Sequence, residues 1–295
     1  MMMRSLVGPL NGFGVTGSLG SSRAGDIGGV VDFAFVGFAA SSFAFGDIAV
    51  ASIRLQLLDS VFAVPTDLLI DEVRSTTITS AVDLGCGPGY TTRRLGDRVR
   101  PARLVGIDLS ESFLKEAAQT MPSAEWLRHD VTQLPLPTGP ADVLHARFVL
   151  SHLPRPESVL ASWLEQLNPG GYLLIQEDER VRAEEPALLL YEEMARSLVT
   201  RRGGDLWVGA RLAAVNPPSD CDTILNGVYA HHVPIALAAQ LFSMNFSVWR
   251  HDPLITQSHS ARLLEKLAHD LAVIASSNRP GDVVFEIRQL AFRRQ

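Results

Sequence analysis

The residues with the clearest chemical potential form a short turn, Asp83-Leu-Gly85-Cys86-Gly87-Pro-Gly89. Residues 81–84 read as a buried strand, and the chain from Tyr90 onward reads as a helix. A strand that turns through glycines into a helix brings the backbone close to a nucleotide-like ligand. Glycine permits this approach because it has no Cβ and tolerates positive φ.

The glycine spacing argues against a dinucleotide. The pattern G-x-G-x-x-G is not met, because the third glycine comes one residue too early. A pyrophosphate needs the helix N-terminus close against it, whereas a nucleoside joined to an amino acid does not. Glycines also collect in ordinary turns, so the motif alone leaves a purely structural role equally open.

Two acidic residues end the next two predicted strands. Asp108 stands where a carboxylate can accept hydrogen bonds from both ribose hydroxyls. Its alternative role is an acidic helix cap, but Ser110 already fills that position. Asp130 stands where a carboxylate can accept from the exocyclic amine of adenine, while the Val131 N–H faces a ring nitrogen. For Asp130 the alternative is a plain turn residue.

The elements that position these residues alternate between strand and helix, which favours βαβ units and a parallel sheet. Because the crossovers are right-handed, the carboxyl ends of the strands gather at one edge and form the ligand crevice. The predicted strands cover residues 81–84, 103–107, 125–128, 141–146, 172–176, 223–233 and 283–292. The predicted helices include residues 65–73, 110–120, 156–167, 186–200, 205–215, 235–246 and 260–274.

The glycine turn, read as acid-x-Gly-x-Gly-x-Gly, resembles motif I of class I (Rossmann-like) S-adenosylmethionine (SAM) dependent methyltransferases. Residues 129–137 resemble the segment of these enzymes that closes over adenine, and residues 146–154 resemble their fourth-strand motif. Residues 168–175 resemble the end of their last helix and the fifth strand that follows it. The resemblance covers residues 75–179 as a set, and a fainter one to bacterial small-molecule methyltransferases continues toward the C-terminus. It implies a doubly wound α/β fold with a mainly parallel seven-stranded sheet, an antiparallel last strand and a helical cap.

The resemblance also implies roles for single residues. The family pattern assigns Asp83, Gly85, Cys86, Gly87 and Gly89 to the methionine moiety, and Arg147 and Phe148 to the neighbourhood of the sulfonium. The expected cofactor site also includes the strand-end residues Asp108, Asp130 and Val131, with Leu109 beside Asp108. SAM is therefore the expected cofactor.

Methyl transfer from a sulfonium needs positioning and exclusion of water more than side-chain chemistry. An oxygen acceptor of high pKa would need a base, and His152 is the first candidate because it follows the fourth strand. A packing or helix-start histidine is the commoner explanation of such a residue. No H-E-x-x-H motif or cysteine cluster indicates a metal, so none is expected.

The acceptor site is expected at the fifth strand end and in the distal segment. Glu177 and Asp178 follow the predicted fifth strand and are candidates to hold a polar acceptor, although solvated loop acids are an equal alternative. The distal candidates are Trp207, His231, Trp249 and Arg250, of which Arg250 could bind a carboxylate. We expect a small, apolar or weakly acidic metabolite as acceptor.

Composition restricts the partners. The formal net charge of −6 and the pI near 5.8 disfavour nucleic acid. The uncharged run 33–46 is too short for a bilayer span of ~20 residues, so no membrane partner is expected. Cys86 and Cys221 offer no disulfide framework, and a cytoplasmic location follows as the default. A monomer or a homodimer is expected.

The domain organisation follows from these segments. Residues 1–54 are a poorly defined N-terminal extension, which could be disordered, pack on the domain, or reflect an upstream start site. Residues 55–180 form the SAM-binding core. Residues 181–295 supply the cap helices and two final strands that complete the same domain.

Two other functions share part of this layout. A nicotinamide-dependent oxidoreductase would also use a strand, glycine turn, helix and acid, but its G-x-G-x-x-G motif is absent, and only Lys115 and Lys266 could supply a lysine. A non-catalytic SAM-binding module would keep the glycine turn without an organised cap. The apolar patterning of the distal segment favours an enclosed acceptor site.

Overall fold

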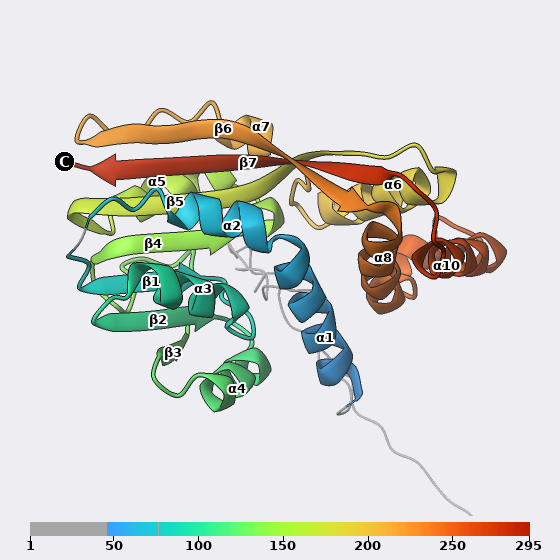
Figure 1. Ribbon diagram of the computed structural model, residues 1–295, viewed down its shortest axis with the longest axis horizontal. Coiled ribbons are helices and arrows are strands. Elements are labelled where there is room, and N and C mark those ends of the chain that lie inside the picture. The colour runs from blue at the N-terminus through green and yellow to red at the C-terminus, as the bar shows by residue number, and fades with distance from the viewer. Residues whose placement is uncertain (1–45, 76) are drawn as a thin grey trace, which may run out of the picture. The chain divides into compact units, whose positions relative to one another are not determined.

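The computed structural model describes residues 46–75 and 77–295, and these form one sheet with helices around it (Figure 1). The strands are β1 (Ser80–Leu84), β2 (Arg103–Asp108), β3 (Glu125–Arg128), β4 (Ala141–Arg147), β5 (Leu167–Arg182), β6 (Cys221–Pro234) and β7 (Asp282–Arg294). The helices are α1 (Gly46–Val61), α2 (Ala63–Ile70), α3 (Tyr90–Val99), α4 (Glu111–Thr120), α5 (Pro156–Leu164), α6 (Pro186–Arg201), α7 (Gly209–Leu212), α8 (Ile235–Trp249), α9 (Pro253–Thr256) and α10 (Ala261–Ala275), with a 3-10 turn, η1 (Leu150–His152).

The seven-stranded sheet has the order β3-β2-β1-β4-β5-β7-β6. Strands β1 to β5 pair in parallel, and β7 runs antiparallel to both of its neighbours, β5 and β6. The last strand in the chain is therefore the one reversed strand. The predicted α/β fold, a doubly wound and mainly parallel sheet with a helical cap, is confirmed.

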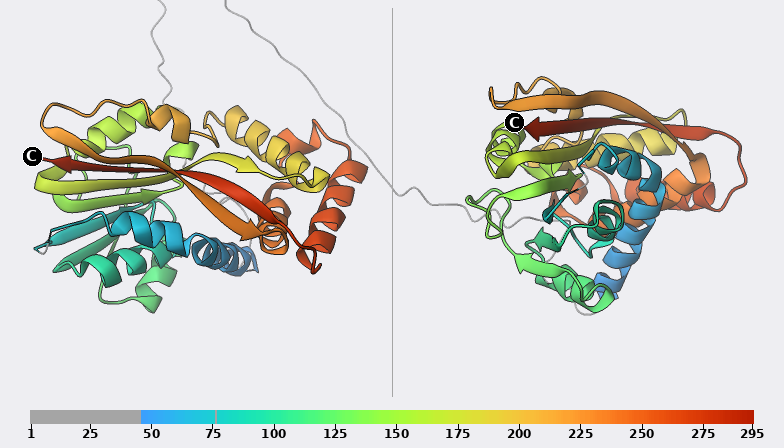
Figure 2. Two further views of the ribbon diagram at one scale, coloured as in Figure 1. Left: turned by 45° about the horizontal axis from the view of Figure 1, so that its top comes forward. Right: turned by 60° about the vertical axis from the view of Figure 1, so that its left-hand side comes forward.

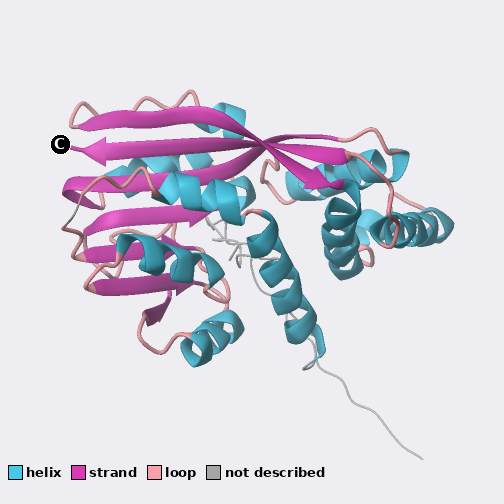
Figure 3. Ribbon diagram, in the orientation of Figure 1, coloured by secondary structure: helices cyan, strands magenta, loops and turns pink. Residues whose placement is uncertain are grey.

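Helices cover both faces of the sheet (Figure 3). Because side chains along a strand alternate in direction, both faces carry apolar side chains that the helices bury. On one face Val143 and Leu174 pack with Leu69 of α2 and Leu95 of α3. On the other face Leu144 and Leu173 belong to one buried cluster with Leu160 and Trp163 of α5. The parallel strands are thus buried on both sides, as their continuous apolar runs predict.

A separate apolar cluster holds the cap together. Helices α6, α8 and α10 gather beyond the carboxyl ends of the central strands (Figure 2). Their buried side chains, among them Leu198, Phe242 and Leu271, pack with Phe62, which follows α1, and with Phe285 of β7. Within the residues described, no helix is long and apolar enough to cross a bilayer.

Three expected boundaries differ from the structure. Helix α1 begins at Gly46, although regular structure was expected only from about Arg54, because the apolar run that precedes Arg54 is helical. Glu177 and Asp178 lie inside β5 rather than after it, because β7 pairs with β5 as far as Arg182. The helix expected over residues 205–215 is only the short α7, which places Leu212 in the core. The predictions for residues 1–45 lie outside the described residues.

Candidate functional site

The glycine turn between β1 and α3 is held against β2 by its backbone. The N–H groups of Gly85 and Cys86 both donate to the Ile107 carbonyl, at 2.8 and 3.0 Å. Gly85 has a φ of +70°, and a Cβ there would lie 2.5 Å from Val149 Cγ2, so a larger residue does not fit. Gly87 has a φ of +52° in a roomier place, so its backbone conformation rather than space requires glycine.

Asp83 lies beneath the turn and supports its shape. One carboxylate oxygen accepts hydrogen bonds from the hydroxyls of Thr91 and Thr92, at 2.6 and 2.7 Å. The other lies 2.7 Å from Nδ1 of His145, and both residues are almost fully buried. Asp83 therefore ties β1 to α3 and β4, and it does not line the cavity beside the turn.

Asp108 connects the end of β2 to the glycine turn. Its two carboxylate oxygens accept hydrogen bonds from the N–H groups of Gly87, at 2.9 Å, and Ser110, at 2.8 Å. Burial raises the pKa of Asp108. Each oxygen keeps a second lone pair, so the carboxylate can still accept hydrogen bonds from a ligand.

A small pocket at the ends of β2 and β3 contains part of the predicted nucleoside site. Its lining comprises Gly85, Asp108, Leu109, His129 and Val131. Asp130 does not line it: its Oδ1 accepts from the N–H and the hydroxyl of Thr132, at 2.9 and 2.8 Å. In the structure Asp130 thus has the contacts of the turn residue that the sequence left as an alternative.

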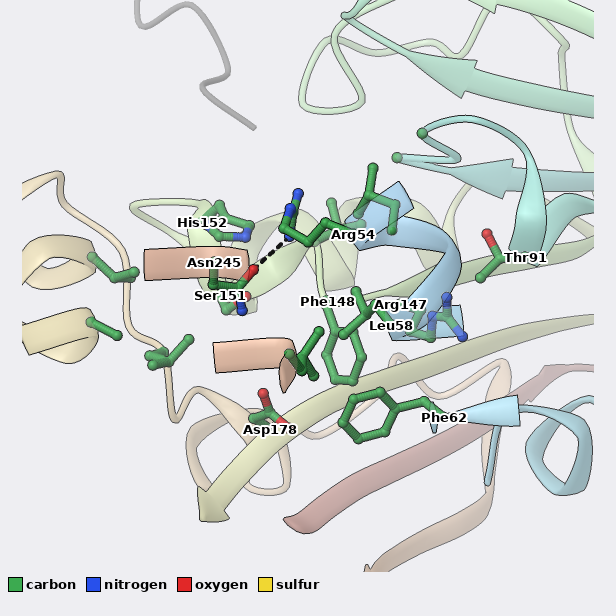
Figure 4. Close-up of a pocket in the computed structure, with 18 of the residues that line it drawn as sticks. Arg54, Leu58, Phe62, Thr91, Arg147, Phe148, Ser151, His152, Asp178 and Asn245 are labelled. Carbon is green, nitrogen blue, oxygen red and sulfur yellow. Dashed lines mark hydrogen bonds between the residues drawn. The ribbon is translucent and has the colours of Figure 1, made fainter. Parts of the chain in front are cut away.

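A larger cavity of about 240 Å3 runs from the glycine turn to the cap helices (Figure 4). Nine of the predicted residues line it: Gly85, Cys86, Gly87, Asp108, Arg147, Phe148, His152, Asp178 and Trp249. Toward the cap its walls are mainly apolar and include Phe62, Leu241 and Phe285. One continuous space therefore joins the nucleotide-type turn to an apolar chamber.

The turn after β4 directs Phe148 into this cavity. Phe148 has a φ of +56°, which is rare for a residue other than glycine and costs backbone energy. Glu177 holds the turn, because its Oε1 accepts from the N–H groups of Val149 and Leu150 at 2.7 and 2.6 Å. The Phe148 ring meets the edge of Phe62, with 5.0 Å between centroids. A buried carboxyl group thus maintains the strained residue at the middle of the cavity.

Arg147 is buried beside Phe148 and has a charged partner from α1. Its Nη1 lies 3.2 Å from Oδ1 of Asp59 and 3.1 Å from the Thr66 hydroxyl. Asp59 also pairs with Arg94 of α3, at 2.8 Å. Burial lowers the pKa of Arg147, and the charge of Asp59 opposes this shift. This network fastens α1 over the cavity.

Burial also shifts the pKa of several other titratable groups near the cavity. It raises the pKa of Glu177 to about 8, of Asp178 to about 7 and of Glu192 to about 8. It lowers the pKa of His152 to about 4, assisted by the charges of Arg54 and Arg202. His152 is therefore neutral near pH 7, as a proton acceptor must be, but it is a weak base. Among the described residues no three His, Cys, Asp or Glu side chains are grouped as metal ligands.

Besides Asp83 and Asp130, five predicted residues lie away from the cavity. Gly89 is the N-cap of α3 and packs against Trp126. Glu177 lies behind the Phe148 turn, and the Trp207 ring stacks under the Arg196 guanidinium, 3.7 Å from its Cζ. His231 Nε2 is 2.7 Å from the Val61 carbonyl oxygen, and Arg250 Nε donates to His251 at 3.0 Å. Arg250 is the C-cap residue of α8 and does not line the cavity.

Sequence reasoning missed several polar residues of the cavity lining, among them Arg54, Tyr191, Glu192 and Asn245. Arg54 precedes the predicted start of regular structure, which hid it. Glu192 carried a usable signal, since it is an acid on the apolar face of α6 between Leu188 and Ala195. An acid in that position is buried when the helix packs, and buried acids are uncommon without a role.

Comparison with known proteins agrees with this geometry. A family model described as a methyltransferase domain matches residues 82–175. A trans-aconitate 2-methyltransferase of Azoarcus sp. is 37% identical over 125 residues, which is 42% of this chain and 48% of the relative. The enzyme of the same name from Methylobacterium nodulans is 37% identical over 133 residues, 45% of this chain and 47% of the relative. The chain thus spans about half the length of these curated relatives.

Solved structures extend the likeness in fold. Coclaurine N-methyltransferase, bound to N-methylheliamine and SAH, matches with a TM-score of 0.52 and 12% identity over 79% of this chain and 72% of that one. A mycolic acid cyclopropane synthase, complexed with SAH and CTAB, matches with a TM-score of 0.51 and 16% identity over 80% and 85% of the two chains. These similarities concern the fold alone.

The sheet order is that of the Rossmann-like methyltransferase fold, and the family match falls on the segment that contains the glycine turn.

Proposed function

We propose that this chain is a SAM-dependent methyltransferase that acts on a small, apolar or weakly acidic metabolite without a metal ion. The observation that carries the proposal is the continuous cavity that extends from the glycine turn to the apolar chamber under α6 and α8. Such concave, mostly apolar sites with a few polar groups bind small molecules. The relatives named trans-aconitate 2-methyltransferase support a metabolite as acceptor.

The residues around the glycine turn fit SAM. Asp108 and Leu109 would hold the ribose, Val131 the adenine edge, and Gly85, Cys86 and Gly87 the methionine part. Arg147 and Phe148 border the same cavity on the side of the chamber. When bound, SAM supplies an electrophilic methyl group on a sulfonium. The protein's share is to align the acceptor and exclude water, for which the aromatic walls are suited.

His152 is the residue that we propose as proton acceptor if the acceptor needs one. It lines the cavity and is neutral near pH 7 because burial lowers its pKa to about 4. A carboxylate acceptor would need no base, since it is already ionised. A cytoplasmic location and a monomeric or homodimeric state stay predictions from the sequence.

The proposal is tested by methyl-labelled SAM. Purified protein and labelled SAM are incubated in three separate reactions: with a bacterial metabolite extract, with tRNA and with DNA. We expect label in the small-molecule fraction only, with none when the protein is omitted. Preferential labelling of tRNA or DNA would contradict the acceptor class.

A further inference from the structure

The cavity contains a second arginine, Arg54 of α1, which differs from Arg147 in having no acidic partner. Its Nη1 donates to Oδ1 of Asn245 on α8 at 2.9 Å. Its Nε is buried without a hydrogen-bond partner. Among the described residues Arg54 takes part in none of the ion pairs, whereas Arg147 is paired with Asp59. Within the part of the chain that the structure describes, the cavity therefore holds one guanidinium without an ion-pair partner.

An unbalanced buried charge is unfavourable unless an opposite charge reaches it. Burial lowers the pKa of Arg54, but a guanidinium stays protonated at any pH that the protein experiences. The planar group presents a fork of donors that matches a carboxylate. A ligand anion would supply the missing partner.

The neighbours of Arg54 place it on the cap side of the cavity. On the same helix Ser52 and Leu55 face the glycine turn: the Ser52 hydroxyl is 3.3 Å from that of Tyr90, and Leu55 is the neighbour of Gly87. Arg54 instead reaches α8 through Asn245, and its charge lowers the pKa of His152. Figure 4 shows Arg54 near His152 and Asn245, with Thr91 well to the other side. Its guanidinium thus faces the chamber where an acceptor would lie.

The chamber also contains two carboxyl groups that leave Arg54 unpaired. Asp178 of β5 and Glu192 of α6 line the cavity, and each has a buried oxygen without a hydrogen-bond partner. Burial raises their pKa values to about 7 and about 8, so near neutral pH they are largely or partly protonated and can donate hydrogen bonds. Arg54 and protonated acids favour an oxygen-rich anion, and the guanidinium would repel an ammonium ion.

We propose that the methyl acceptor is an organic acid and that Arg54, with Asn245, binds its carboxylate. Asp178 and Glu192 face a second polar group of the same molecule, and the aromatic walls contact its carbon skeleton. This inference rests on the proposed function, because it names the substrate class of that same site.

The test compares acids with their uncharged counterparts on the full-length protein saturated with SAH. The probes are trans-aconitate, cinnamate, octanoate and 4-hydroxybenzoate, each beside the corresponding carboxamide, titrated by calorimetry. The variants are Arg54→Gln and, as a control, Arg262→Gln, an exposed arginine on α10. SAH affinity reports whether each variant keeps a formed site.

We expect at least one acid to bind the wild type about tenfold or more tightly than its carboxamide. Arg54→Gln should remove this preference while its SAH affinity stays within about threefold, and Arg262→Gln should behave as the wild type. The inference is overturned if no acid is preferred, or if the preference survives in Arg54→Gln. It is also overturned if Arg54→Gln weakens SAH binding but not that of 5′-methylthioadenosine, because Arg54 would then hold the methionyl carboxylate. Failure of the wild type to bind SAH would reject the proposed function instead, and the acids would still test Arg54 in the free protein.

Discussion

At the scale of single residues, the cavity depends on carboxyl groups that differ in what they contact. Asp83 and Glu177 shape two turns from beneath, Asp108 bridges a turn and the cavity, and Asp178 and Glu192 face the chamber. Their contacts predict different effects of substitution, since a supporting group affects folding and a lining group affects binding.

Asp108 gives the first test at this scale. Replacing it with alanine should weaken SAM binding by about 1–3 kcal/mol, because charge-assisted hydrogen bonds to the ribose are lost. Calorimetry on folded protein measures the change. Asp108→Asn is the matched variant: it retains one oxygen acceptor and should lose less. Unchanged SAM affinity in folded Asp108→Ala would remove Asp108 from the site.

Glu177 gives a pH-dependent test. Burial raises its pKa to about 8, so the folded state binds this proton more tightly than the unfolded state does. Its stabilising contribution is complete below the ordinary carboxyl range and is lost as the pH rises toward 8. Glutamine cannot ionise but can still accept from Val149 and Leu150. As the pH rises from 5 to 8, the free energy of unfolding of the wild type should therefore fall relative to that of Glu177→Gln.

Urea titrations at several pH values measure this difference, and Glu193→Gln, on the exposed side of α6, is the control. A constant difference between Glu177→Gln and the wild type across this range would show that Glu177 has no raised pKa.

At the scale of elements, α1 closes the cavity through one ion-pair network. Asp59 is nearly buried and joins Arg94 of α3 to Arg147 after β4. Asp59→Asn leaves the buried Arg147 guanidinium without its counter-charge and should cost about 3–5 kcal/mol of stability. The exposed Asp71, paired with Arg98, offers a control: Asp71→Asn should cost about 1 kcal/mol or less.

Urea denaturation measures the free energy of unfolding of both variants. Adding Arg147→Met to Asp59→Asn should recover part of the loss, because it removes the unbalanced charge. Equal destabilisation by Asp59→Asn and Asp71→Asn would show that the network does not fasten α1.

The elements with strong periodicity were the predictable ones. Strands β1, β2 and β4 read as short apolar runs bounded by turns, and α8 and α10 read as helices close to their observed bounds. Two boundaries were unpredictable for physical reasons. The extra length of β5 comes from pairing with β7, which is distant in sequence, and α1 lies in a run whose composition shows no clear period.

At the scale of the whole fold, the residues that could be predicted from the sequence lie mostly at one end of the cavity. Those that could not be predicted lie mostly at the other end. Local motifs after β1 and β2 identified Gly85, Gly87 and Asp108, because a turn or a strand end fixes their position. Arg54 and Asn245 meet only through the packing of α1 against α8, which no local pattern encodes. The lining at the glycine turn could therefore be predicted from the sequence, whereas most of the lining under the cap helices required the fold.

The proposed function requires that the glycine turn binds SAM and that the cavity beyond it receives the methyl acceptor. Calorimetric titration of the wild type with SAH and with NAD tests it most directly. We predict a single site for SAH, from which SAM displaces it, and much weaker or no binding of NAD. Absence of SAH binding, or NAD binding tighter than SAH binding, would contradict the account.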